Sequence, residues 1–264
     1  MNNKIKMIIT DLDKSLLNSN YEISDYTANI FMKCKENGII IVFATARPYR
    51  NTKIFFNKII PNVVICHSGA IIYENDKEIF QCGINKNITE ELLLNISTNY
   101  PDVEIGIENN DKIYANFDPS KYWPENKSYI SLDINNLPEK DMDKIIVKAI
   151  SVEKTKEIKN YLHKQLYFYL GYPDMANIMN KNATKWNAIK ILLDKYNIEV
   201  KNTIAFGDDS NDIEMIEKCG IGVAVENGID EIKCKAKYIC GKNSDDGIAN
   251  WIEEYLGENY EIRI

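Results

Sequence analysis

The chain has 264 residues, of which 45% are hydrophobic and 27% charged, the balance of an ordinary globular protein. Its formal net charge of -7 excludes a general nucleic-acid binder, which needs a basic face. An anionic substrate is still compatible with this charge if a metal ion or a local cation holds it.

The numbers of histidines and cysteines limit the kinds of metal site and the cellular compartment that we expect. Two histidines are too few for a three-histidine zinc site, and the six cysteines form no C-x-x-C pair, so we expect reduced thiols in a cytoplasmic protein. The apolar run at 7–9 is too short for a signal peptide, and no stretch approaches the roughly 18 to 20 apolar residues of a membrane helix. Heavy use of Asn, Lys and Ile suggests a bacterial genome rich in A and T.

The first eighty residues alternate between apolar runs and helix signals. Short apolar runs without polar interruptions are typical of strands that are buried on both faces. In chain order we expect a strand at 5–10, a helix at 24–38, a strand at 39–44, a helix beginning near Pro48, a strand at 63–66 and a hairpin of 70–73 with 78–80.

The pattern changes near Gly83. After a helix at 87–94, the middle of the chain contains mainly extended segments and few parallel-type βα repeats. The expected elements are extended segments at 103–107, 112–117, 144–150 and 166–170, a long loop within 118–138 and a helix near 153–163. This segment therefore reads as an α+β insertion.

From about residue 173 the alternation returns. The expected elements are a helix from the cap Thr184 to Leu193, strands at 203–206, 221–225 and 238–240, and helices at 213–217 and 248–256. The simplest organisation is an α/β, Rossmann-like core formed by 1–82 and 173–264, with an inserted α+β cap at 83–172. Repeated βα units predict a mainly parallel sheet, whose ligands lie at the carboxyl ends of the strands.

Chemically informative residues follow these predicted strands. Asp11 and Asp13 follow the first strand, Thr45 to Pro48 follow the second, and the strand at 203–206 leads into Gly207 to Asp212. Parallel strands would bring four or five carboxylates to one edge of the sheet. Such a cluster needs a cation, and oxygen ligands favour Mg²⁺.

The positions of the carboxylates after the predicted strands suggest their roles. Asp11, at the strand end, suits a nucleophile that forms an aspartyl-phosphate, and Asp13 suits the acid that protonates the leaving group and later activates water. Asp208 would complete a metal site with Asp11 and the main-chain oxygen of Asp13. Asn211 or Asp212 would hold ligands or phosphate in place.

Three further side chains suit a phosphate ester. The hydroxyl of Ser15 and exposed backbone N–H groups can line a phosphate site, and Thr45 can donate to a phosphoryl oxygen. Lys185, at a helix start, supplies positive charge beside the phosphate and Asp11. Phosphoryl transfer needs mainly positioning and charge neutralisation, which this set offers.

These elements, in this order, resemble the haloacid dehalogenase superfamily of phosphohydrolases, and the insertion resembles the cap of its subfamily IIB, the Cof-type phosphatases. The resemblance implies an Mg²⁺-dependent enzyme with Asp11 as nucleophile and Asp13 as acid/base. The resemblance puts metal-binding roles on Asp11, Asp13 and Asp208, and phosphate-binding roles on Thr45, Lys185 and Asn211. Together with the neighbouring side chains, the predicted metal ligands are Asp11, Asp13, Asp208 and Asp212, and the predicted substrate-binding residues are Ser15, Thr45, Ala46, Arg47, Lys185 and Asn211.

The motifs depart from the family pattern at several positions. Where members commonly show D-x-D-G-T, T-G-R-P and N-G-A, this chain has Lys14-Ser15, Thr45-Ala46-Arg47-Pro48 and His67-Ser68-Gly69-Ala70. Ala46 requires a backbone that tolerates a Cβ, and Lys14 adds a charge near the phosphate. These departures bear on substrate choice more than on the reaction.

The predicted function is hydrolysis of a small phosphorylated metabolite, a sugar phosphate or a phosphorylated cofactor, by a cytoplasmic bacterial enzyme without nucleic-acid or membrane partners. Two alternatives stay open. A phosphomutase would pass the phosphoryl group to another hydroxyl, and a non-catalytic module would only bind the phosphometabolite. The sequence names neither the substrate nor the oligomeric state.

Overall fold

A computed structural model describes residues 4–171 and 174–260, with side chains described up to residue 257. The chain forms two compact units. The larger comprises Met1–Ile79 with Thr184–Ile264, and the smaller is the continuous segment Phe80–Ala183. The insertion predicted from the sequence is thus a separate unit, and each unit is described by itself.

The larger unit is built on a sheet in the strand order β14-β13-β12-β1-β2-β3-β4-β5. The six strands from β14 to β3 are parallel, and β4 is antiparallel to β3. The strands are β1 (Met7–Thr10), β2 (Ile40–Ala44), β3 (Val63–Cys66), β4 (Ile71–Glu74), β5 (Lys77–Gln81), β12 (Thr203–Gly207), β13 (Ile221–Val225) and β14 (Tyr238–Cys240). The central strands are entirely buried, as their uninterrupted apolar runs predict.

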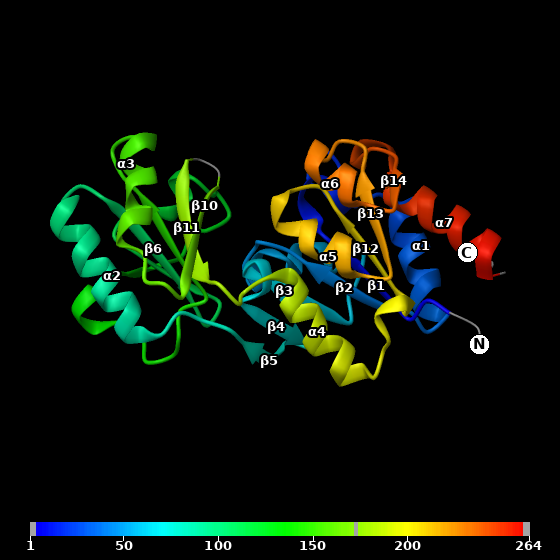
Figure 1. Cartoon of the computed structure of the whole chain (residues 1–264), viewed down its shortest axis with the longest axis horizontal. Coiled ribbons are helices and arrows are strands. Elements are labelled where there is room, and N and C mark those ends of the chain that lie inside the picture. Colours follow the sequence, from blue (N-terminus) through cyan, green and yellow to red (C-terminus); the bar gives the residue numbers. More distant parts are fainter. Residues whose placement is uncertain (1–3, 172–173, 261–264) are drawn as a thin grey trace. The chain divides into compact units, whose positions relative to one another are not determined.

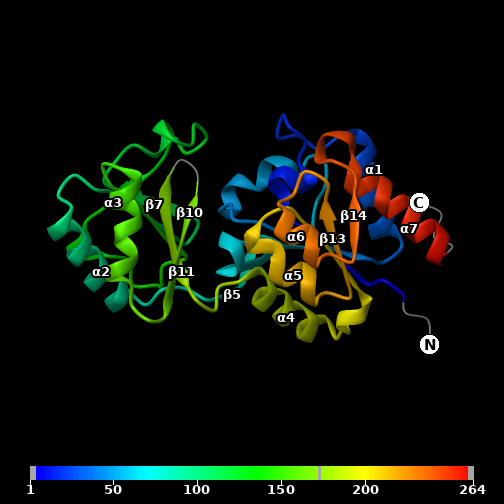
Figure 2. The same ribbon diagram turned by 45° about the horizontal axis from the view of Figure 1, so that its top comes forward.

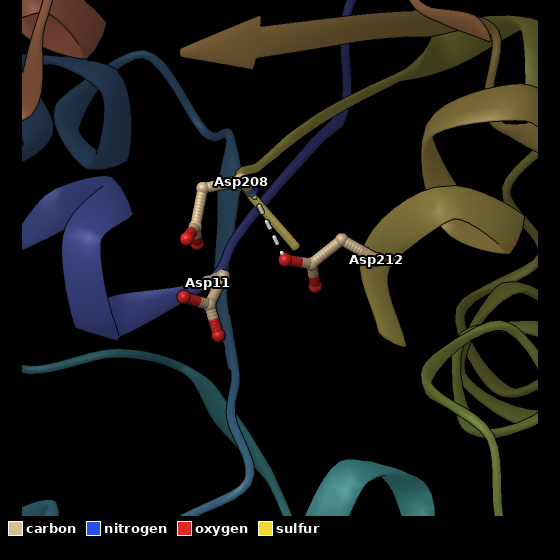
Figure 3. A group of neighbouring side chains, drawn as sticks. All are labelled: Asp11, Asp208 and Asp212. Carbon is tan, nitrogen blue, oxygen red and sulfur yellow. Dashed lines mark hydrogen bonds between the residues drawn. The ribbon is translucent and has the colours of Figure 1, made fainter. Parts of the chain in front are cut away.

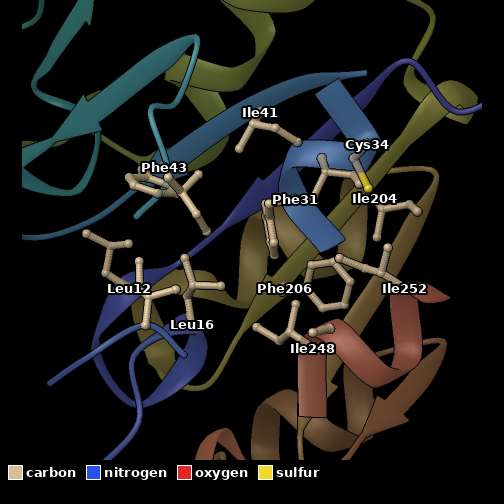
Figure 4. Packing of buried hydrophobic residues seen from close by; sticks show 14 of the residues in the cluster. Leu12, Leu16, Phe31, Cys34, Ile41, Phe43, Ile204, Phe206, Ile248 and Ile252 are labelled. Atoms are coloured by element: carbon tan, nitrogen blue, oxygen red, sulfur yellow. The ribbon is translucent and has the colours of Figure 1, made fainter. Parts of the chain in front are cut away.

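Helices cover both faces of this sheet, with α1 and α7 on one face and α4, α5 and α6 on the other (Figures 1 and 2). They are α1 (Asp25–Glu36), α4 (Lys185–Tyr196), α5 (Ile213–Lys218), α6 (Asp230–Lys235) and α7 (Gly247–Tyr260). Alternate strand residues such as Ile41 and Phe206 pack against Phe31 of α1 and Ile248 of α7 (Figure 4). This three-layer packing holds the strand ends in register, which fixes the loops that follow them.

The smaller unit is a sheet in the order β10-β11-β9-β6-β7-β8 with helices on one face. Its strands are β6 (Glu104–Asn109), β7 (Lys112–Ala115), β8 (Ile130–Ser131), β9 (Lys144–Lys148), β10 (Leu166–Gly171) and β11 (Met175–Asn180), and its helices are α2 (Lys86–Asn99) and α3 (Val152–Glu157). Apart from the parallel pair β7–β8, the pairing is antiparallel. Leu92 and Leu93 of α2 pack against Ile105 and Ile145 of the sheet.

The second boundary of the insertion lies later than the sequence indicated. Residues 175–180 form β11, which pairs with β10 and β9, so the smaller unit extends to Ala183 rather than ending at 172. The first boundary, at 79/80, lies close to the expected 82/83. The expected boundary falls between β10 and β11, which pair with each other in one sheet.

Three local predictions also differ. In place of the helix expected after Pro48 there are two single 3₁₀ turns, Tyr49–Asn51 and Lys53–Phe55. The helix expected at 153–163 ends at Glu157 and continues only as the 3₁₀ turn Ile158–Tyr161. Within the long loop, residues 130–131 form the short strand β8.

Over residues 4–171 and 174–260, none of the helices combines the length and the apolar content that crossing a membrane requires.

Candidate active site

The turn that follows β1 presents the first carboxylates. The chain winds tightly from Asp11 to Leu17, with the Leu16 and Leu17 amides donating to the carbonyls five residues earlier. Lys14 takes a left-handed conformation (φ 59°) in this turn, and its carbonyl accepts a hydrogen bond of 2.7 Å from Asn227 Nδ2. A polar contact from a distant segment therefore helps to hold the backbone between Asp11 and Ser15.

Three buried carboxylates converge at the carboxyl ends of β1 and β12. Asp11, Asp208 and Asp212 each offer an oxygen, and these oxygens lie within 4.8 Å of one another (Figure 3). Asp11 follows β1, Asp208 follows β12, and Asp212 lies one turn further on. The predicted convergence of strand ends is therefore present in the structure.

Asp212 folds back toward the start of its own loop. Its Oδ2 accepts from the backbone amides of Asp208 and Asp209 at 3.1 and 3.3 Å. Gly207 makes this approach feasible, because a Cβ there would lie 2.5 Å from the Cβ of Asp212. The glycine in Gly207-Asp208-Asp209 is therefore required by close packing, and Asp212 orders the loop that carries Asp208.

Lys185 lies at the centre of the cluster. It is the first residue of α4, after the N-cap Thr184, whose hydroxyl accepts from the amide of Asn187. Its ammonium nitrogen is 2.6 Å from Asp11 Oδ1 and 2.5 Å from Asp212 Oδ1, and its side chain is fully buried. Lys185 thus forms buried ion pairs with two carboxylates, whereas the ammonium group of an ordinary helix lysine is solvated.

The charges in this cluster shift one another's pKa values. Burial raises the pKa of Asp11 well above its usual range, and the charges of Asp212 and Asp208 add to this against the opposing effect of Lys185. Burial and the charge of Asp212 raise the pKa of Asp208 to about 6. Burial alone would lower the pKa of Lys185, but Asp11 and Asp212 raise it above its usual value.

This arrangement fits a divalent cation. One ammonium group faces three buried carboxylates, so the cluster carries excess negative charge. The ammonium of Lys185 pairs with Asp11 and Asp212, and the carboxylate of Asp208 lies beside them. Its Oδ1 accepts from the Ser15 hydroxyl at 2.9 Å, which orients the carboxylate within the cluster. Hard oxygen donors of this kind suit Mg²⁺.

The side chain of Asp13 lies apart from that cluster and pairs with Arg47. The guanidinium Nε lies 2.8 Å from Asp13 Oδ2, and Nη2 lies 2.5 Å from Oδ1. This two-point contact is partly exposed. Among the described residues, the buried acidic group does not include the Asp13 carboxylate, so only its main-chain oxygen stays a predicted ligand.

A second polar group forms around the turn after β3. Asn211 Nδ2 lies 3.3 Å from Ser68 Oγ, and the amide of Ser68 donates to the carbonyl of Thr45. Ser68 has a left-handed backbone (φ 52°), and Gly69 (φ 114°) packs so closely on Thr184 that a Cβ would lie 2.2 Å from its carbonyl oxygen. The turn thus brings Thr45, Ser68 and Asn211 together beside the start of α4.

The structure therefore connects most of the predicted site residues. Asp11, Ser15, Asp208, Asp212 and Lys185 form one bonded group. The other predicted residues fall into the Arg47–Asp13 pair and the Thr45–Asn211 group, while Ala46 lies between Thr45 and Arg47, half-buried.

Two contributors were missed by sequence reasoning. Ser68 stands in the motif His67-Ser68-Gly69-Ala70, where the family that the sequence resembles commonly has Asn, and that substitution was the available signal for a polar role. Asn227, which holds the turn at Lys14, lies 213 residues away from it and carries no local signal.

Comparisons with known proteins agree with this geometry. Residues 8–252 match the model of the haloacid dehalogenase-like hydrolase family. Over 270 residues the chain is 25% identical to 5-amino-6-(5-phospho-D-ribitylamino)uracil phosphatase YitU of Bacillus subtilis (strain 168), covering 97% of this chain and 99% of that protein.

Solved structures share the whole fold. TM0651 from Thermotoga maritima superposes with a TM-score of 0.84 at 24% identity, covering 95% of this chain and 97% of that one. The sugar phosphatase BT4131, of subclass IIB of the same superfamily, gives a TM-score of 0.81 at 20% identity, covering 95% and 98%. At these identities the likeness is one of fold, and it confirms the predicted α/β core with an inserted unit.

Proposed function

Because the chain belongs to the haloacid dehalogenase-like hydrolases and is an enzyme, a phosphatase of that type, we propose that it hydrolyses small phosphate monoesters with Mg²⁺ through an aspartyl-phosphate at Asp11. The observation that carries the proposal is the buried contact of Asp11 and Asp212 with Lys185 beside Asp208. This geometry combines a nucleophile with fixed positive charge, and it leaves excess negative charge for a cation.

In the first step a carboxylate oxygen of Asp11 attacks the phosphorus of the ester. The P–O bond to the leaving group breaks in line with the attack, and the carboxyl group of Asp13 gives its proton to the departing oxygen. The product alcohol leaves, and the phosphoryl group is bound to Asp11 as a mixed anhydride.

In the second step the carboxylate of Asp13 takes a proton from water, and the resulting hydroxide attacks the same phosphorus. The bond between phosphorus and Asp11 breaks, which releases inorganic phosphate and restores the Asp11 carboxylate. Asp13 regains its proton, so one water is consumed for each ester cleaved.

Charge in both steps is balanced by groups already in place. Lys185 keeps its proton because two carboxylates raise its pKa, so it neutralises negative charge at Asp11 and the phosphoryl oxygens. Thr45, Ser68 and Asn211 offer donors at the neighbouring turn. Mg²⁺, held by Asp11 and Asp208, would supply further positive charge to the phosphoryl group.

For the substrate class we propose a sugar phosphate or a phosphorylated cofactor. The name of the Bacillus subtilis relative specifies a phosphoribityl-aminouracil, and BT4131 is titled a sugar phosphatase. Both leaving groups are polyhydroxylated alcohols, which are poor leaving groups and need the acid at Asp13. We place the enzyme in the bacterial cytoplasm, in keeping with its free cysteines.

The experiment is phosphate release from a panel of phosphorylated metabolites and p-nitrophenyl phosphate, with Mg²⁺ or with EDTA. We expect wild-type turnover that requires Mg²⁺, and a loss of at least about a thousandfold in Asp11→Asn. Asp209→Asn, which keeps an exposed N-cap side chain beside the site, is the matched control and should keep its turnover.

Three outcomes would contradict the proposal. Substantial turnover by Asp11→Asn would remove Asp11 as nucleophile, and full activity in excess EDTA would remove the metal. Conversion of one phosphate isomer into another without free phosphate would identify a mutase, and tight binding without turnover would identify a binding module.

A further inference from the structure

Arg47 makes a contact that the two reaction steps above leave unused. Its guanidinium grips both oxygens of Asp13, with Nε and Nη2 at 2.8 and 2.5 Å. The sequence motif assigned Arg47 to the substrate instead. We propose that Arg47 is a positioning residue, which acts on catalysis through the orientation of Asp13 and contributes little to phosphate affinity; this inference rests on the proposed function of Asp13.

The guanidinium is itself held from several sides. It lies over the rings of Tyr21 and Phe55, with its central carbon 5.9 and 5.3 Å from the ring centroids. At the backbone, the Arg47 amide donates to Thr45 Oγ1 at 3.2 Å, and the Arg47 carbonyl accepts from the amide of His67. An arginine anchored at its main chain and at its head is a rigid support for a partner.

One of these supports, the ring of Tyr21, comes from a tight loop at residues 18–22. Residues 18–22 close on themselves, because the amide of Asn18 donates to the carbonyl of Glu22 and the amide of Tyr21 donates to that of Asn18. Tyr21 adopts a left-handed conformation (φ 59°) at the tip of this loop, and its side chain is largely exposed. An exposed tyrosine in a disfavoured conformation is explained here by the contact of its ring with Arg47.

The charge arrangement separates the two roles that Arg47 could have. Lys185 is fully buried between Asp11 and Asp212 and already provides a cation beside the nucleophile. Arg47 instead directs its planar fork at a carboxylate, the geometry in which a guanidinium makes its strongest contact. To bind phosphate with the same two nitrogens it would have to release Asp13.

Orientation matters most when the leaving group needs a proton. A two-point contact restrains both side-chain torsions of Asp13 and uses one lone pair on each oxygen. The remaining lone pair, at which the proton is carried, therefore stays directed at one place. A nitrophenolate leaves readily without protonation, whereas an alkoxide does not. Loss of Arg47 should therefore slow an alkyl phosphate far more than p-nitrophenyl phosphate.

The test is a double-mutant cycle of Arg47→Ala with Asp13→Asn, measured on p-nitrophenyl phosphate and on one alkyl phosphate. We expect Arg47→Ala to reduce kcat for the alkyl ester about ten- to a hundredfold, and to reduce it only a few-fold for the nitrophenyl ester. In the Asp13→Asn background, removing Arg47 should cause no further loss. Arg47→Lys should restore only part of the rate, because an ammonium makes a one-point contact.

Two further variants test the support of Arg47 and provide a control. Tyr21→Asn keeps a residue that tolerates the left-handed conformation but removes the ring, and it should show the same leaving-group pattern at a few-fold. Lys58→Gln is the matched control, because it removes a neighbouring cation that pairs with Asp25 at the surface. It should leave both rates unchanged.

A binding measurement decides the matter without turnover. Calorimetric titration with inorganic phosphate in the presence of Mg²⁺ should give the same affinity for wild type and Arg47→Ala. A tenfold or greater loss of affinity, multiplicative losses in the cycle, or equal slowing of the two esters would each overturn the positioning role. Failure of wild type to release phosphate from either ester would defeat the proposed function, and the titration would still distinguish the two roles of Arg47.

Discussion

The two halves of the site are built in opposite ways. The inner half, Asp11, Asp208, Asp212 and Lys185, is buried, and its charges are tied to one another and to backbone amides. The outer half is the Asp13–Arg47 pair, with 38% and 18% of the two side chains exposed. The pair is supported by aromatic rings and a surface loop.

Because of this difference, we expect substitutions in the two halves to have different effects on the stability of the fold and on the catalytic rate. A buried charge cannot lose its partner without a large desolvation penalty, so changes in the inner half should affect folding and catalysis together. A partly exposed pair can be broken while water solvates both ends, so changes in the outer half should affect the rate and leave the fold intact.

The largest expected effect comes from Lys185→Met, which leaves Asp11 and Asp212 without their shared cation. We expect turnover to be lost and the free energy of unfolding in EDTA to fall by about 3 kcal/mol, as for other buried pairs that lose one partner. Urea denaturation provides the measurement. Lys195→Met, at the exposed end of the same helix, is the control, and equal stabilities of the two variants would refute the assigned burial cost.

Next in size is Asp13→Asn. It should reduce turnover of alkyl phosphates by about 10² to 10⁴, the usual contribution of general acid catalysis, and reduce that of p-nitrophenyl phosphate much less. The free energy of unfolding should change by less than about 1 kcal/mol, because the pair with Arg47 is partly exposed. The surface variant Asp25→Asn is the control and should behave as wild type. A large loss of stability in Asp13→Asn would contradict the expected difference between the two halves.

A third prediction concerns pH and metal together. The pKa of Asp208 is raised from 3.8 to about 6 in the folded protein, so between these values the folded state binds more protons than the unfolded state. In metal-free protein this carboxyl therefore stabilises the fold at low pH, and that contribution is lost as pH rises through about 6. The expected decline is roughly 3 kcal/mol.

Mg²⁺ should reverse the loss because it binds the ionised form. We expect added Mg²⁺ to raise the melting temperature clearly at pH 8 and little at pH 5. Other carboxyls titrate in this range, so the informative quantity is the difference between wild type and Asp208→Asn. An identical pH dependence of stability in the two proteins would contradict the assigned shift.

The smallest expected effect is that of Ser15→Ala. The hydroxyl orients Asp208 through one hydrogen bond of 2.9 Å, which contributes about 1 kcal/mol. We expect a few-fold higher Mg²⁺ requirement and normal turnover at saturating Mg²⁺. Ser244→Ala removes a comparable bond to a carboxylate at the surface and should not alter the Mg²⁺ requirement.

Much of the larger unit could be predicted because short stretches of its sequence indicate by themselves whether they are buried and which element they form. The run Ile39 to Ala44 has no polar position, which is typical of a strand covered on both faces, and β2 is found there. Asp11, Asp208 and Lys185 were predicted from their places at strand ends and a helix start. A parallel sheet brings such positions together whatever the side-chain details are.

What failed depended on contacts between distant segments. The run Met175–Asn180 becomes a strand through its pairing with β9 and β10, and its own residues do not alternate strongly enough to indicate it. Arg47 and Asp13 are 34 positions apart, and their two-point contact depends on the close turn after β1 and on side-chain torsions. The backbone approach that Gly207 permits was likewise invisible along the chain.

The insertion also has a consequence for how the protein is made. The carboxylate of Asp11 and the ammonium of Lys185 are separated by 174 positions, and Phe80–Ala183 accounts for most of them. At about 5 to 20 residues per second, a ribosome needs roughly 10 to 35 seconds to synthesise that interval. Throughout this interval β1 lacks its neighbour β12 and Asp11 lacks its counter-ion, whereas the strands β6 to β11 of the smaller unit are all synthesised before it ends. The nascent chain therefore completes the unit encoded in the middle of the gene before the unit that begins it.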